Sequence, residues 1–151
     1  MLEAFTSLLS TLAPALGLPE ITVRDDDPSC LLVIDDFEVS LRYLPGADAV
    51  MLFTVVAPLP EKDRETLYAS LLDANTFFRS TQGFTLAARE DTGITLQGVM
   101  PLRVLDSANV AVWLQNFVDV AAIWQDICVS DQRNDALDET LGAFPQDMLR
   151  V

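Results

Sequence analysis

The sequence predicts an α+β domain in which a helix, three strands, a second helix, two strands and a third helix follow one another along the chain. Apolar residues recur at helical spacing in three segments, and the segments between them alternate apolar and polar residues or form short apolar runs. Turns rich in Asp, Gly and Pro separate these runs, which favours a twisted antiparallel sheet packed by the helices. The 151 residues, half of them hydrophobic, suffice for one domain with its own core.

The first three elements are expected in the N-terminal third of the chain. Residues 2–13 form a helix, because their apolar positions follow helical spacing and Pro14 disfavours a continuation. The apolar run 30–34 predicts a short strand. Residues 37–43 alternate apolar and polar side chains, which indicates a second strand with one buried and one solvated face.

The third predicted strand has an unusual composition. Residues 49–59, AVMLFTVVAPL, are apolar on both faces except at Thr54. A strand of this kind is typical of the centre of a sheet that is covered on both sides. Helices can supply one cover, and we expect the other from a second subunit or a bound partner, because a small domain has few elements to spare.

The second helix is expected over residues 60–78, with Pro60 in its first turn. Its apolar face is wider than one contact with a sheet requires. That face consists of a stripe, Leu67, Leu71, Ala74 and Phe78, with Tyr68, Leu72 and Asn75 beside it.

A hairpin and a third helix complete the pattern. Residues 84–88 and 94–97 alternate around a turn in which Gly93 supplies a positive φ. The third helix begins with Asp106 or Ser107 as its N-cap and ends near residue 128.

The C-terminal residues differ in character from the rest of the chain. Residues 130–151 are polar and acidic, and they predict either a short extra helix or a mobile tail. We therefore expect one domain over 1–129 and an acidic extension over 130–151.

Composition excludes several classes of function. The chain has no histidine, which removes the commonest general base and the usual zinc ligand. Nine Lys and Arg residues against a net charge of −14 argue against nucleic acid and against anionic membrane surfaces as partners. Cys30 and Cys128 lie far apart in apolar runs, which favours buried free thiols over a disulfide or a redox pair. A basic or apolar protein partner fits this charge.

The N-terminal segment does not predict a leader sequence or a membrane span. No Lys or Arg occurs before Arg24, so the basic region of a signal peptide is missing. Polar residues interrupt the apolar positions of the first helix, which makes it amphipathic. We expect a cytoplasmic protein.

Two acidic motifs could carry chemistry, and we interpret both as turns. Asp91-Thr92-Gly93 matches the signature of an aspartic protease, but alternating strands flank it closely, as in a two-strand turn. The clusters 25–27 and 35–36 lack the ligand spacing of a calcium loop. The sequence thus predicts no enzyme, no catalytic residue, no metal, no cofactor and no small-molecule substrate.

Several motifs taken together resemble the class I type III secretion chaperones, the Tir chaperone or CesT-like family. The likeness spans residues 2–128. It is carried by Leu71-Leu72-Asp73-Ala74-Asn75-Thr76-Phe77, Gly83-Phe84-Thr85-Leu86-Ala87, Gly93-Ile94-Thr95-Leu96, Met100-Pro101-Leu102 with Leu105, and the stretch from Leu114 to Trp124.

The resemblance implies a homodimeric, secretion-chaperone-like fold that binds the N-terminal segment of a secreted effector in extended form and keeps it ready for export. By similarity, the second helix supplies the dimer interface, for which the candidates are Leu67, Leu71, Asn75 and Phe78. The candidates for an apolar client groove are Phe5, Leu9, Leu12, Leu86 and Leu96. Residues of this kind are also typical of a plain core, and both interpretations stay open.

A second function remains open beside the chaperone. The same fold can serve as a regulatory binding module that sequesters a transcription factor or a component of the secretion apparatus. Neighbouring genes distinguish the two, because a gene for a large secreted protein supports the chaperone and a gene for a regulator supports the module.

Overall fold

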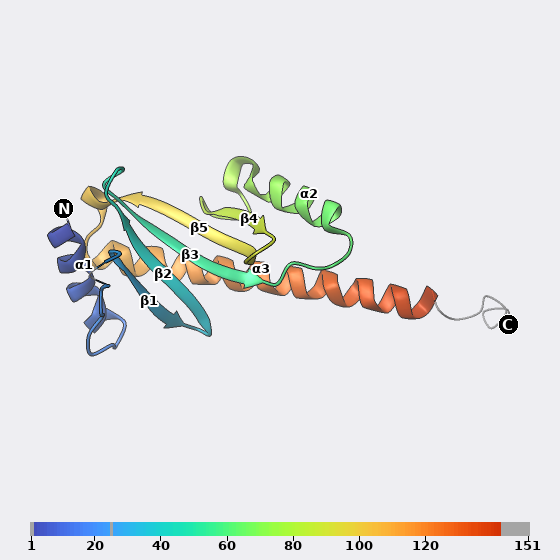
Figure 1. The fold of residues 1–151 in the computed structure, drawn as a ribbon, viewed down its shortest axis with the longest axis horizontal. Coiled ribbons are helices and arrows are strands. Elements are labelled where there is room, and N and C mark those ends of the chain that lie inside the picture. Colours follow the sequence, from blue (N-terminus) through green and yellow to red (C-terminus); the bar gives the residue numbers. More distant parts are fainter. Residues whose placement is uncertain (1, 25, 143–151) are drawn as a thin grey trace.

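The computed structural model of the protein describes residues 2–24 and 26–142, with side chains as far as Asp131. Over this part of the chain the predicted α+β order of elements is confirmed (Figure 1). The elements are α1 (Leu2–Ala15), β1 (Ser29–Ile34), β2 (Phe37–Leu44), β3 (Ala49–Ala57), α2 (Arg64–Asn75), β4 (Thr85–Arg89), β5 (Gly93–Pro101) and α3 (Ser107–Gly142), with short 3-10 helices η1 (Thr76–Phe78) and η2 (Leu102–Val104).

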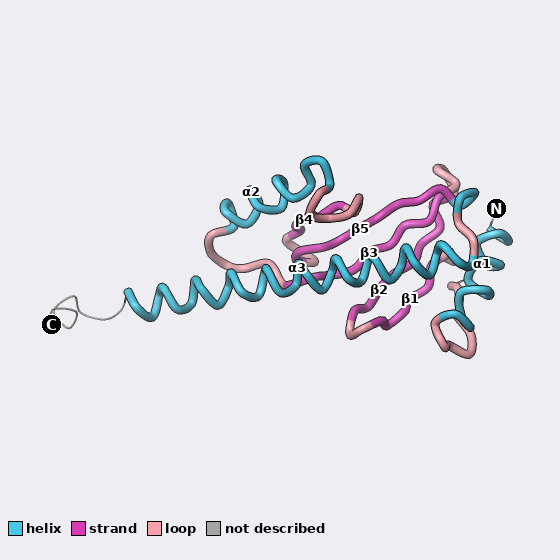
Figure 2. The backbone as a smooth tube through the Cα atoms, turned by 180° about the vertical axis from the view of Figure 1, so that it is seen from behind, coloured by secondary structure: helices cyan, strands magenta, loops and turns pink. Residues whose placement is uncertain are grey.

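The five strands form one antiparallel sheet in the order β1-β2-β3-β5-β4. The long helix α3 crosses one face of this sheet against the central strand β3, and α1 packs against α3 (Figure 2). The helix α2 lies at the other side of the molecule, next to the edge strand β4 (Figure 1). We call the face under α3 the helix-covered face and the opposite one the open face.

The hydrophobic core lies between the helix-covered face and the two helices. Because side chains alternate along a strand, every second residue of each strand points into this space. The largest fully buried side chains are Phe5, Leu9, Leu12, Val39, Leu41, Val50, Leu52, Val56, Ile94, Leu96, Leu114 and Phe117. Aromatic pairs join the layers: the ring of Phe5 stacks on Tyr43 at 5.8 Å, and Phe84 meets Phe117 edge to face at 5.1 Å.

The second helix is shorter than predicted. We expected it over 60–78, whereas α2 occupies Arg64–Asn75. Asp63, just before it, has a left-handed backbone with φ 56°, so the preceding residues do not join the helix. At the other end Phe77 has φ 57°, which interrupts the helical path after Asn75.

Backbone chemistry sets the ends of the central strands. β3 stops at Ala57, two residues earlier than predicted, because Pro58 has no N–H to donate to a neighbouring strand. Gly93 opens β5 with φ 106°, and a Cβ added there would lie 2.6 Å from the carbonyl oxygen of Ala57. The turn therefore needs glycine both for its conformation and for this close approach.

The third helix is longer than predicted. We expected it to end near residue 128, but α3 continues without a break to Gly142. The helix contains no Gly or Pro before that residue, so nothing in the local chemistry stops it earlier. Residues 143–151 lie outside the described part of the chain, and the division into 1–129 and 130–151 stays a prediction.

Candidate partner-binding surfaces

The five residues predicted to line a client groove lie in the core of the protomer. Phe5, Leu9 and Leu12 are buried on α1, and Leu86 and Leu96 are buried on the helix-covered face in β4 and β5. Burial in this protomer agrees with the core interpretation of these residues and gives no support to a groove. Their contact with a client stays a prediction, and exposed apolar residues are the better candidates.

The four predicted dimer-interface residues divide into two groups. Leu71 is buried, and Leu67 is partly buried against the core. The Asn75 amide fastens α2 to β4, because its Nδ2 donates to the carbonyl oxygen of Leu86 at 2.8 Å and its Oδ1 accepts from the N–H of Leu86 at 2.8 Å. Phe78 is exposed.

A cluster of exposed apolar side chains lies on the outside of α2 and η1. Leu72 is 69% exposed and Phe77 is 84% exposed, and Tyr68 and Phe78 lie on the same elements. Phe77 and Phe78 both have left-handed backbones, with φ 57° and 52°. This conformation is unfavourable for bulky residues, so the chain spends free energy to hold two aromatic rings outside the core. We call these four residues the outer α2 surface.

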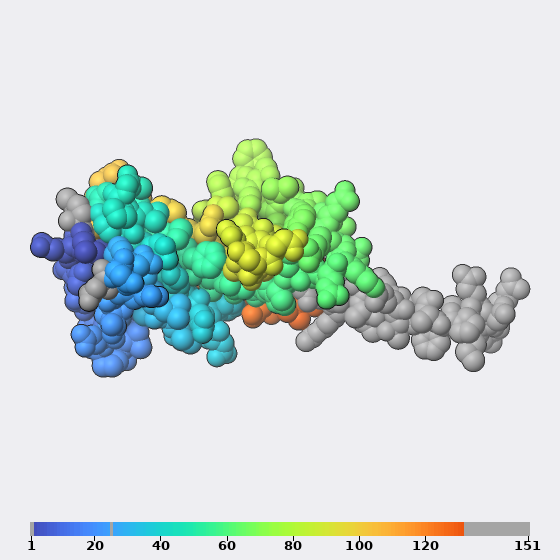
Figure 3. All heavy atoms as spheres, viewed as in Figure 1, coloured from blue at the N-terminus to red at the C-terminus, as the bar shows by residue number. Residues whose placement is uncertain are grey.

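The open face of the sheet carries a second apolar surface. Leu31, Val33, Val55 and Val99 are 61%, 68%, 42% and 57% exposed, with Met51 and Phe53 partly buried among them. The register places these residues on one side, since Leu31 is opposite Ser40, Ser40 opposite Phe53, and Met51 opposite Val99. Figure 3 views this side, where atoms of the strands themselves form the surface. The polar side chains Glu38, Ser40 and Arg42 of β2 lie between the apolar residues of β1 and those of β3. Exposed apolar side chains grouped in this way are typical of interaction surfaces.

The open face bears on the prediction for the third strand. β3 is central in the sheet, and its buried residues Val50, Leu52 and Val56 face the helices. On its other side Val55 remains exposed. Within the described protomer only one of the two expected covers is present, and a cover from a second subunit or a bound partner stays a prediction.

The two edges of the sheet differ in their hydrogen bonding. At β4, the Asn75 side chain of α2 takes up the outward N–H and C=O of Leu86, as described above. At β1, the Tyr43 N–H donates to the carbonyl oxygen of Pro28 at 2.9 Å, so these two residues form a hydrogen-bonded pair. Hydrogen-bonded and non-hydrogen-bonded pairs alternate along an antiparallel ladder. The N–H and C=O groups of Leu31 and Val33 therefore point away from β2. No backbone hydrogen bond within the described residues takes up these groups. An unpaired edge of this kind can accept an additional strand.

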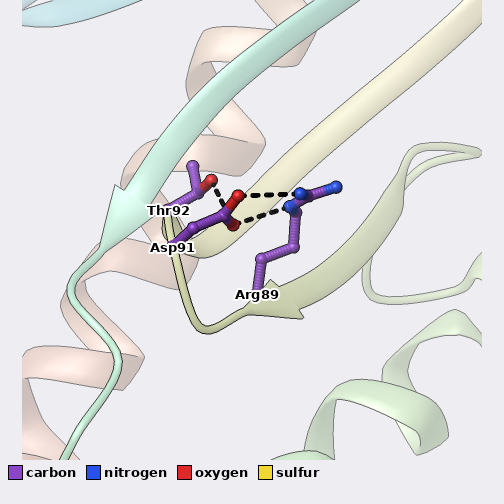
Figure 4. Close-up of polar contacts among 3 residues, drawn as sticks. All are labelled: Arg89, Asp91 and Thr92. Atoms are coloured by element: carbon purple, nitrogen blue, oxygen red, sulfur yellow. Dashed lines mark hydrogen bonds and ion pairs between the residues drawn. The ribbon is translucent and has the colours of Figure 1, made fainter.

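The candidate protease motif is a surface turn. Asp91 accepts hydrogen bonds from Arg89 Nε at 2.9 Å and Nη2 at 2.8 Å, and from the Thr92 hydroxyl at 2.9 Å (Figure 4). These bonds, with Arg89 foremost, hold the pKa of the Asp91 carboxyl well below its usual range. A protease dyad needs carboxyls that share a proton, and this carboxylate is exposed and fully ionised.

The other acidic clusters also have structural roles. Asp35 and Asp36, with φ 48° and 70°, form the two-residue turn between β1 and β2. Asp27 pairs with Arg42 at 2.9 Å, and Asp25 lies outside the described residues. In the part of the chain that the structure describes, no three His, Cys, Asp or Glu side chains are grouped as a metal site.

Both cysteines are buried free thiols, as predicted. Burial raises the pKa of each thiol to about 11, and for Cys128 the nearby Asp131 carboxylate adds to the effect. Thiols of this kind are poor nucleophiles at neutral pH. None of the described helices is both long enough and apolar enough to span a membrane.

Sequence reasoning missed the residues that make the open face available. The predicted surfaces came from apolar stripes at helical spacing and from the third strand, which is apolar on both faces. The run Cys30-Leu31-Leu32-Val33 carries the same signal, because it is apolar on both faces although it belongs to an edge strand. An edge strand that is apolar on both faces indicates a partner.

Comparisons with known proteins agree with this architecture. A model of the Tir chaperone protein (CesT) family matches residues 7–125. No curated protein sequence matches the chain.

Solved structures provide a second comparison. The chain is similar to a protein in the HopA1-SchA chaperone-effector complex, with 16% identity, a TM-score of 0.68, and coverage of 83% of this chain and 95% of that one. It is also similar to a protein in the ExsC-ExsE complex, with 23% identity, a TM-score of 0.71, and coverage of 83% and 94%. A third likeness is to the structure of the Yersinia pestis type III secretion chaperone SycH with a fragment of YscM2, with 23% identity, a TM-score of 0.63, and coverage of 79% and 98%. At these identities the likenesses establish the fold.

Proposed function

Because this chain belongs to the Tir chaperone protein (CesT) family, we propose that it is a bacterial cytoplasmic chaperone of type III secretion. It binds the N-terminal segment of a secreted effector in extended form and keeps it ready for export. The observation that carries this proposal is the open face, because its exposed apolar side chains adjoin the unpaired edge of β1. The complex described as chaperone and effector, HopA1-SchA, supports the same function.

The edge of β1 and the open face suit an extended client. A client strand beside Leu31 and Val33 gains main-chain hydrogen bonds from β1, and its side chains on one side lie over the open face. Each large client side chain buried there contributes roughly 1.5–3 kcal/mol. The net charge of −14 accelerates the encounter with basic segments.

The outer α2 surface suits a second copy of the chain. A two-fold dimer brings the same residues of both protomers together, so Leu72, Phe77 and Phe78 of each copy are covered by the other. Leu67, Leu71 and Asn75, the other predicted interface residues, act from behind this surface by holding α2 on β4. Dimer formation also explains why two phenylalanines are held outside the core.

The protein acts by binding and not by catalysis. The ionised Asp91 turn and the two buried thiols offer no activated group. The regulatory module of the same fold binds a transcription factor or a secretion component in place of an effector. The family is described as a chaperone family, which favours the effector.

Co-purification from the native host tests the function. We expect the chain to co-purify with a secreted effector, and limited proteolysis of the complex to leave one protected client segment close to the effector N-terminus. A protected regulator that is never secreted supports the alternative. A client that is digested throughout argues against binding in extended form.

A substitution in β1 tests the mode of binding. Val33→Pro removes an outward N–H, and proline is tolerated at a sheet edge for this reason. We expect at least tenfold weaker client binding with a nearly unchanged melting temperature. Val33→Thr, the matched control, keeps the N–H and should bind more tightly than the proline variant. Full binding by both variants would exclude the β1 edge.

A further inference from the structure

A hollow of about 500 Å³ lies at the end of the sheet where β1 turns into β2. Open-face residues line most of it, and Phe37, Thr54 and Gln125 line it from the helix-covered side. Leu31 and Phe53 stand on either side of Ser40, because the three residues are opposite one another in β1, β2 and β3. The small serine between two large side chains leaves the space. Gln125 of α3 reaches its lining and is fixed there by a hydrogen bond from Nε2 to the carbonyl oxygen of Val56 at 3.2 Å.

Two carboxylates line the hollow. Glu38 lies two residues before Ser40 on the same face of β2, and Asp36 comes from the adjoining turn. Among the described residues neither carboxylate forms an ion pair. Arg42, on the same face of β2, is already paired with Asp27. The hollow therefore has apolar walls and uncompensated negative charge.

We propose that this hollow binds the side chain of an arginine or lysine in the client segment, a proposal that rests on the proposed function. Long basic side chains bury an apolar stem while the charged end keeps polar partners. Leu31 and Phe53 flank the stem, and Glu38 accepts charge-assisted hydrogen bonds from the end. The client class is an extended segment with one basic residue and apolar residues two positions away on either side.

The distance across the strands favours a long side chain. A client strand beside β1 lies about 4.8 Å beyond it, so Ser40 on β2 lies roughly 10 Å from the client backbone. A valine or threonine at that client position ends over Leu31. An arginine or lysine spans the gap and reaches Glu38.

Selection from a random peptide library tests this specificity with the full-length protein. Displayed peptides selected on the wild type should be enriched in arginine or lysine at one position, with apolar residues two positions before and after it. Selection on Glu38→Lys should remove the basic residue from this position. Asp119→Lys is the matched control, because it changes net charge equally at an exposed position of α3, on the helix-covered side of the sheet.

Affinity measurements on one selected peptide test the contact itself. Replacing its basic residue by norleucine should raise Kd about tenfold with the wild type, as expected for loss of a charge-assisted hydrogen bond. With Glu38→Gln the same replacement should change Kd less than about twofold, because the two changes remove one interaction. Ser40→Leu fills the hollow and should abolish the preference for the basic residue without lowering the melting temperature.

The outcomes separate this proposal from the chaperone function. Enrichment of apolar segments with no basic position would overturn the hollow as a basic subsite and leave the chaperone function in place. Equal loss of the preference in Asp119→Lys would show general charge attraction, which also overturns it. Failure of any extended peptide to be enriched would count against both proposals.

Discussion

The two faces of the sheet carry similar apolar residues but differ in their exposure to solvent. On β5, Leu96 is fully buried under the helices, whereas Val99, three residues further on, is exposed on the open face. The helix-covered face completes its packing within the protomer through α1 and α3. In the described part of the chain Leu31, Val33, Val55 and Val99 of the open face have no such cover. Apolar residues in a strand thus show that a surface is buried somewhere, but not by which chain.

The largest effect should separate the two faces on a single strand. Leu96→Asp places a charge without a partner in the core, which costs about 3–5 kcal/mol. We expect this variant to be largely unfolded by circular dichroism. Val99→Asp, the matched change on the open face, should keep the wild-type melting temperature and weaken client binding. Unfolding of both variants would mean that the open face is also needed within the protomer.

The same contrast extends to the first helix. Leu9 was a groove candidate and is buried on α1, so Leu9→Asp should lose client binding only together with folding. Leu2→Asp, at an exposed position of the same helix, should fold normally. A folded Leu9→Asp that fails to bind would restore the groove interpretation.

The next effect concerns the two sides of α2. Leu72→Asp charges the outer α2 surface and should convert a dimer into a folded monomer, because an unpaired charge cannot be buried at the interface. Light scattering at micromolar concentration measures the mass. Asp73→Asn, next to it on the helix, serves as the control and should remain dimeric. A wild-type monomer at this concentration would refute the dimer.

A smaller effect tests polarity on the helix-covered face. Thr54 is buried there, and its hydroxyl donates to the carbonyl oxygen of Glu38 at 2.9 Å. Thr54→Val keeps the shape and removes this hydrogen bond, so it should lower the free energy of unfolding by about 1 kcal/mol. Urea denaturation measures the change. An increase in stability would show that the free energy of desolvating the hydroxyl exceeds the free energy gained from its hydrogen bond.

The smallest expected effect on stability concerns Asp91, in the turn between β4 and β5. Asp91→Asn should leave folding and client binding intact. The folded-state pKa of Asp91 is lowered, chiefly by Arg89, so its stabilising effect is present above the unfolded value of 3.8 and is lost as pH falls further. The small difference in melting temperature between wild type and variant should therefore shrink below about pH 4. Peptide cleavage that depends on Asp91 would overturn the assignment.

Local patterns in the sequence determined much of the fold. The alternation in residues 37–43, the doubly apolar third strand and the glycine turn at Gly93 are signals within a few residues of one another, and each gave the right element. The end of α2 did not follow from periodicity, because Phe77 continues the apolar pattern while its backbone leaves the helix. The extension of α3 to Gly142 was missed because a polar composition was read as the end of a helix.

Which apolar residues are covered was decided only by the tertiary structure. Phe5 and Leu96 fit a groove or a core in the sequence, and the structure buries both, whereas Leu31 and Val33 belong to an apolar run and are exposed. The fold class, the family resemblance and the lack of histidine chemistry follow from composition and local patterns alone. A strand can be covered on either face, so the positions of α1, α2 and α3 on the sheet determine which apolar residues remain exposed. Hydrophobicity fixes how much surface must be buried, and only the packing of distant elements selects which part is left for another chain.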